Sequence, residues 1–208
     1  MSPLLMGLLG VMLLPLFVAN WRSSLLGLSC QGLLIGWAAY RLDPHLASPH
    51  TWLTLADLVL LRGFGAPLLL YRALRGKNRA LHQQFFSPNL LTWTIALGLV
   101  LAAFNLAASL IPQDGDERAL TSVATAGVLL AFLVLASQAG AFGQVVGALR
   151  LENGIALFEL GEQQRHEHIT LHIGQLALVL ATLSLYLWLF RGLVETHEAH
   201  ASTDEPTL

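Results

Sequence analysis

The stretch GALRLENGIALFEL, residues 147–160, places Arg150, Glu152 and Glu159 inside an otherwise apolar run. The chain around it is 55% hydrophobic and only 12% charged, which favours a helix that crosses a bilayer. A charge at the centre of a bilayer costs at least about 2.5–3.5 kcal/mol on insertion scales. Three ionisable groups in one span therefore suggest a role in ion or proton movement.

The composition of the 208-residue chain indicates an integral membrane protein, because a soluble domain carries about twice this charged fraction. A net charge of −2 speaks against a nucleic-acid partner. The single cysteine, Cys30, excludes an internal disulfide and a multi-cysteine metal cluster. The sequence has no phosphate-binding or dinucleotide-binding glycine loop and no zinc-protease motif. We therefore expect no catalytic residues, cofactor or metal, and expect any chemistry to lie on another chain.

The apolar runs divide the chain into membrane spans separated by short polar links. We expect seven spans, at about residues 4–19, 25–40, 52–74, 90–111, 119–139, 142–160 and 169–190. They would form one transmembrane domain over residues 1–194, followed by a disordered acidic tail over residues 195–208. A polar turn is expected at residues 20–23.

The basic residues predict the orientation of these spans. The basic loop over residues 72–79, with Arg22 and Arg191, places six basic residues on one side and leaves three on the other. Because basic residues accumulate in cytoplasmic loops, the N-terminus should lie outside and the C-terminus in the cytoplasm.

Glu152 and Glu159 are the residues that we expect to respond to a moving charge. Seven residues along an α-helix correspond to a rotation that differs by only about 20° from two full turns, with a rise of about 10 Å. The two carboxylates should therefore line one stripe, with Arg150 and Arg62 as candidate partners. Two interpretations stay open: a proton relay, or a static arginine partner at Glu152 with Glu159 in water at the helix end.

Asp57 and Arg62 lie five residues apart in the third predicted span. On an α-helix this spacing is about 140°, so we expect each to pair with another helix, with an interfacial position also open for Asp57. Gly63 and Gly65 would let another backbone approach. Pro67 would free a carbonyl one turn earlier.

His172 begins the seventh predicted span and could shuttle protons. His168 lies four residues before it, so a metal could bridge the two rings. A solvated or pH-sensitive rim is the interpretation that we favour over a metal.

The residues GALRLENG at 147–154 resemble the Glu-Asn-Gly stretch of component E of hydrogenase-4, a membrane subunit of formate-hydrogenlyase-type complexes. Arg62, Pro67 and the following LLLY at 68–71 are similar to the corresponding span of that family. Size, seven spans and the order of these features extend the resemblance over nearly the whole chain.

The last three spans, in which residues 143–190 hold the charged helix and its successor, are also similar to the small three-helix subunit K of respiratory complex I and to its counterpart in multisubunit cation/proton antiporters. In that family a glutamate on the middle helix belongs to the hydrophilic axis, and Glu152 matches its position. Two departures stand out. The seventh span lacks the family's second glutamate, and members of the hydrogenase family carry lysine where this chain has Arg62. Arginine stays protonated, so it could bias a relay but could not pass a proton.

The resemblance implies a non-catalytic membrane-arm subunit of a redox-coupled, proton-translocating complex in the bacterial inner membrane. Its partners would be antiporter-like membrane subunits and the redox subunits of an oxidoreductase complex. Two alternatives stay open: a purely structural anchor of such a complex, and an independent small ion or solute transporter.

Overall fold

The computed structural model describes residues 3–17, 20–42, 49–75, 90–112, 115–138, 140–162 and 173–189, and this part of the chain is helical and contains no strand. The elements are α1 (Pro3–Phe17), α2 (Trp21–Leu42), α3 (Pro49–Ala56), η1 (Asp57–Gly65), α4 (Ala66–Leu74), α5 (Leu90–Leu110), α6 (Asp116–Ser137) and α7 (Ala141–Glu162). A final helix over Ile173–Leu189 is called the last helix below. With α3, η1 and α4 taken as one continuous helix, the described residues form seven helices, as predicted.

Three of these helices are long and apolar enough to cross a membrane: Thr51–Leu74, Leu90–Leu110 and Asp116–Ser137. The turn predicted at residues 20–23 is wrong, because α2 already begins at Trp21. The Asn20 side chain accepts a hydrogen bond of 3.1 Å from the backbone N–H of Arg22. An asparagine just before a helix stabilises its first turn in this way, so the polar residues start the helix.

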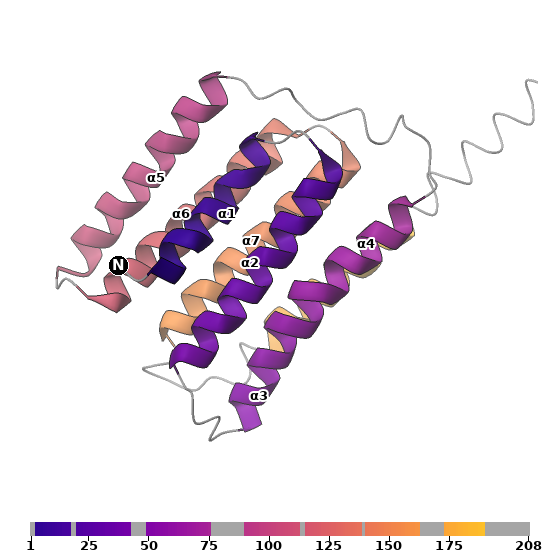
Figure 1. Cartoon of the computed structure of the whole chain (residues 1–208), viewed down its shortest axis with the longest axis horizontal. Helices are drawn as coiled ribbons and strands as arrows, with labels where there is room; N and C mark the ends of the chain where they lie inside the picture. Colours follow the sequence, from indigo (N-terminus) through magenta and orange to yellow (C-terminus); the bar gives the residue numbers. More distant parts are fainter. Residues whose placement is uncertain are drawn as a thin grey trace, which may run out of the picture.

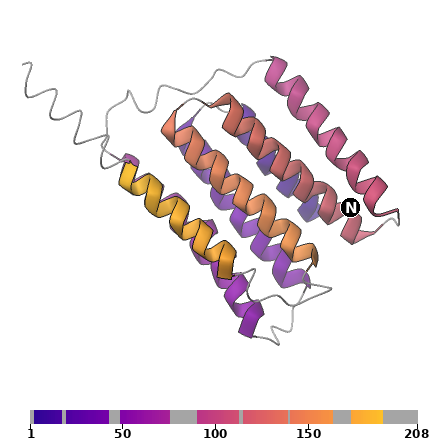
Figure 2. The ribbon, with the colours of Figure 1, turned by 180° about the vertical axis from the view of Figure 1, so that it is seen from behind.

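The helices lie in two layers (Figures 1 and 2). One layer contains α1, α2 and the α3–η1–α4 helix, and the other contains α5, α6, α7 and the last helix. Across the layers, α1 packs against α6 and α2 packs against α7. The last helix lies at the edge of the second layer, beside α7; it lies in front of α4 in Figure 2 and behind it in Figure 1.

Glycines allow two pairs of helices to approach closely. A Cβ on Gly32 of α2 would lie 2.7 Å from the backbone nitrogen of Gly63 in η1. A Cβ on Gly154 of α7 would lie 3.1 Å from the backbone nitrogen of Val128 in α6. The expectation that Gly63 lets another backbone approach is confirmed, and the partner is α2.

Two apolar clusters form the core of the described helices. The first contains Leu8, Ile35, Leu58, Val123 and Leu157, among others. The second contains Leu28, Leu70, Val145, Leu149 and Val179, among others. On α2, on the η1–α4 helix and on α7, the two clusters are separated by a short polar segment. These segments define the site described next.

Candidate functional site: a buried polar layer

A layer of polar side chains crosses the bundle between the two apolar clusters. Its members are buried and come from three helices: Gln31 of α2, Asp57 and Arg62 of η1, and Arg150, Glu152 and Asn153 of α7. Burying charges in an apolar interior is costly unless they are paired or hydrogen-bonded. Hydrophobic burial alone therefore does not explain why these side chains lie in the interior of the fold.

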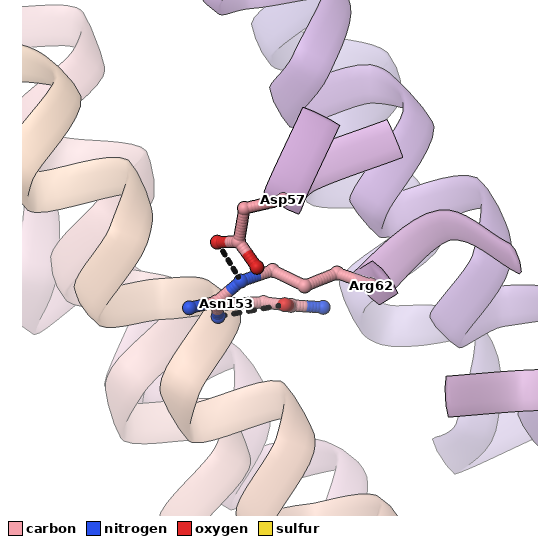
Figure 3. Close-up of polar contacts among 3 residues, drawn as sticks. All are labelled: Asp57, Arg62 and Asn153. Carbon is pink, nitrogen blue, oxygen red and sulfur yellow. Dashed lines mark hydrogen bonds and ion pairs between the residues drawn. The ribbon is translucent and has the colours of Figure 1, made fainter. Parts of the chain in front are cut away.

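Asp57 and Arg62 form an ion pair within η1, with 2.9 Å between Arg62 Nε and Asp57 Oδ2 (Figure 3). Both side chains are almost fully buried within the bundle. The prediction that the two residues pair with other helices is wrong for this contact. The helix is π-wound from Asp57 to Gly65, and a π-helix bonds residues five apart, so the side chains meet.

The sequence offers a physical reason for the π-winding. Pro67 has no backbone N–H, and in an α-helix its ring would clash with the carbonyl of Gly63. A wider winding before the proline relieves this clash, and the backbone N–H of Ala66 accordingly donates to the carbonyl of Leu61, five residues back. The proline therefore contributes indirectly to bringing Asp57 and Arg62 together.

Arg62 also joins η1 to α7. Its Nη1 donates a hydrogen bond of 3.3 Å to Oδ1 of Asn153 (Figure 3). Asn153 was not among the predicted site residues, although it directly follows Glu152. An amide in an apolar run, next to a glutamate, is the signal that could have identified it. Nη2 of Arg62 and Nδ2 of Asn153 are buried and have no partner among the described residues.

Glu152 faces the last helix. The Thr182 hydroxyl donates a hydrogen bond of 2.6 Å to Oε1 of Glu152, whose side chain is buried. The other oxygen, Oε2, is buried without a partner in the described part of the chain. Arg62 and Asp57 both act electrostatically on Glu152. Thr182 was not predicted as a site residue, because nothing in its sequence neighbourhood distinguishes it from a threonine that only packs.

Arg150 does not serve as the partner of Glu152 that the sequence suggested. Residues two apart on a helix point in different directions, and Arg150 turns toward α1 instead. Its Nη1 donates a hydrogen bond of 3.2 Å to the backbone carbonyl of Met12, while Nε and Nη2 are buried without partners among the described residues. Gly27 of α2 provides room for the guanidinium, because a Cβ there would lie 2.8 Å from Nη2.

Glu159 lies two turns further along α7 and is half-buried. Arg62 and Asp57 act electrostatically on Glu159 as they do on Glu152, so the ion pair in η1 influences both carboxylates. A rise of about 10 Å separates two residues seven apart on a helix, which is too far for one hydrogen bond. His172, the remaining predicted site residue, lies outside the described residues, as does His168.

The space enclosed by Arg62, Glu152 and Asn153 is too narrow for a water molecule. For a proton to leave Glu152 through water, side chains would have to move and let water enter the layer. The described residues include no group of three histidine, cysteine or acidic side chains that could hold a metal. The arrangement can hold and respond to charge through the Asp57–Arg62 ion pair and the Glu152 carboxylate.

Comparisons with protein-family models, with curated proteins and with solved structures find no match to this chain.

Proposed function

We propose that the chain is a seven-span subunit of a bacterial inner-membrane complex, with its N-terminus outside and its C-terminus in the cytoplasm. The complex would be hydrogenase-4-like or complex I-like and would couple redox chemistry on other subunits to proton translocation. In this proposal the buried polar layer contributes charges to a hydrophilic axis near the middle of the membrane.

The observation that carries the proposal is the environment of Glu152. The residue is only 7% exposed, and on α7 it lies between two apolar clusters; among the described residues its Oε1 has one hydrogen bond and its Oε2 has none. A buried carboxylate with an unused oxygen can accept a proton or a new donor at small geometric cost. Ionisable residues buried within transmembrane segments typically mark ion pathways and proton relays.

Arg62 and Asp57 have a supporting role in this proposal. Arginine stays protonated, so Arg62 provides a fixed positive charge within the polar layer. Asp57 offsets that charge through the ion pair, and both act on Glu152 and Glu159. A change in the Asp57–Arg62 contact would therefore be felt by both carboxylates.

The test is Glu152→Gln in the chain assembled with its partner subunits. A tagged chain is purified with its complex, the complex is reconstituted into vesicles, and the pH gradient formed during turnover is measured with a fluorescent dye. We expect intact assembly and a loss of proton translocation. Asp116→Asn, an exposed acidic residue in the first turn of α6, is the matched control and should translocate normally. Normal translocation by the Glu152 variant would refute the role.

A structural anchor is the second candidate function, and the dry packing around the layer favours it. Under that function the charges are static and serve only to position helices. Glu152→Gln would then leave translocation unchanged while the thermal stability of the assembled complex fell. The same experiment therefore separates the two functions.

A further inference from the structure

A groove of about 360 Å³ lies between α2 and the η1–α4 helix. Gly32 of α2 lies close to Gly63 of η1. The same two helices meet again where Trp21 stacks on Tyr71 of α4, with ring centroids 5.7 Å apart. The groove lies between these two contacts.

Apolar side chains form most of the groove. It is lined chiefly by Leu25, Leu26, Phe64, Pro67, Leu68 and Tyr71. Leu26 is 66% exposed and Phe64 is 56% exposed, so the groove opens to the surroundings of the bundle and not to its core. An apolar groove on a surface that would face the membrane suits an acyl chain.

One end of the groove carries positive charge. Arg22 lines it, and its guanidinium carbon lies 5.4 Å from the centre of the Trp21 ring. Arg72 and Arg75 are exposed in the last turn and at the end of α4, next to Tyr71. None of the described residues that line the groove is acidic, and Arg22 has no carboxylate partner in the described part of the chain.

We propose that this groove binds an anionic phospholipid, with the headgroup phosphate at Arg22 and one acyl chain along Leu26, Phe64 and Leu68. Tryptophan and tyrosine are enriched at the headgroup level of membranes, which is the level that the Trp21–Tyr71 stack would occupy. In the proposed orientation this end is cytoplasmic, and basic pockets between helices on that side bind anionic headgroups. The inference rests on the membrane location in the proposed function, but it does not depend on any role of Glu152.

The test uses the full chain, purified in detergent after its membrane association has been verified by resistance to alkaline extraction. Phosphatidylglycerol and phosphatidylcholine with identical acyl chains are the probes, and bound lipid is counted by native mass spectrometry. We expect at least a fivefold preference for phosphatidylglycerol. Arg22→Gln should remove most of this preference, and Ser29→Trp, which fills the groove, should lower the occupancy of both lipids. Arg41→Gln, an exposed arginine at the other end of α2, should bind as the unmodified chain does.

Three results would overturn the inference. The first is equal binding of the two lipids. The second is an equal loss of the preference in the Arg22 and Arg41 variants, which would indicate diffuse electrostatic attraction. The third is crosslinking of a partner helix at Leu26 in the intact complex. The Glu152→Gln variant should bind phosphatidylglycerol normally. Failure of the lipid site and failure of the proton-translocation role are therefore distinguishable, because each is measured on a different variant.

Discussion

Removing either charge of the Asp57–Arg62 pair should destabilise the fold strongly. The two side chains are buried and joined at 2.9 Å, so Asp57→Asn leaves Arg62 as an uncompensated buried cation. Breaking a buried pair by removing one partner typically costs about 3–5 kcal/mol, whereas replacing both by apolar residues of similar size is often nearly neutral. Because a factor of ten corresponds to about 1.4 kcal/mol, the single change should shift the unfolding equilibrium by more than about a hundredfold.

Arg62→Met should cost more than Asp57→Asn, because it also leaves Oδ1 of Asn153 without its donor. An unsatisfied buried group of this kind costs a further amount of about 1–3 kcal/mol. The double variant, Asp57→Leu with Arg62→Met, should be far more stable than the sum of the single effects indicates. Partial recovery in the double variant is the signature of a direct pair.

The measurement is the free energy of unfolding in detergent micelles, followed by far-ultraviolet circular dichroism. Arg22→Gln is the control, because this arginine is exposed and its loss should change the stability little. The reasoning is refuted if Asp57→Asn costs less than about 1 kcal/mol, since the buried pair is expected to exceed the value of an exposed one. It is also refuted if the single effects add in the double variant to within about 0.5 kcal/mol, the range expected of independent sites.

Two further substitutions test the helix contacts around the layer. Gly32→Ala places a Cβ 2.7 Å from the backbone nitrogen of Gly63 and should destabilise the bundle by about 1–3 kcal/mol, as overpacking does. Gly98→Ala on α5, where a Cβ would meet nothing within 4 Å, should be neutral or slightly stabilising. Thermal unfolding of both variants in the same detergent compares them. Thr182→Val removes the donor to Glu152 and should cost about 1.5–3 kcal/mol in chemical unfolding, while Thr182→Ser keeps the hydroxyl and most of the stability; equal losses in the two variants would exclude the hydrogen bond as the cause.

The helices were predictable because the chain alternates long apolar runs with short polar links. The third span, predicted at about residues 52–74, corresponds to a helix from Pro49 to Leu74, and the sixth, predicted at about residues 142–160, corresponds to Ala141–Glu162. The predicted and observed helices differ mainly at their ends. The second helix begins at Trp21, whereas its apolar run begins only at Leu25. Periodicity and length indicate that a helix exists, whereas capping side chains decide where it starts.

The partners of the charged residues were less predictable, and each difference has a local cause. An α-helix would have separated the side chains of Asp57 and Arg62, but the π-winding before Pro67 brings them together. Arg150 of α7 reached the carbonyl of Met12, 138 residues earlier in the chain, because α1 and α7 both pack against α2 and α6. Backbone carbonyls accept hydrogen bonds without leaving any mark in the sequence, so this partner could not be foreseen.

From the amino-acid order alone follow the all-helical class, the seven helices and the presence of charges within apolar runs, because these depend on hydrophobicity counted along the chain. The tertiary structure decided which atoms meet: Asp57 with Arg62, Arg62 with Asn153, and Thr182 with Glu152. Those contacts depend on the winding of one helix and on the rotation and depth at which neighbouring helices pack. A single sequence does not encode these quantities in any pattern that can be read residue by residue.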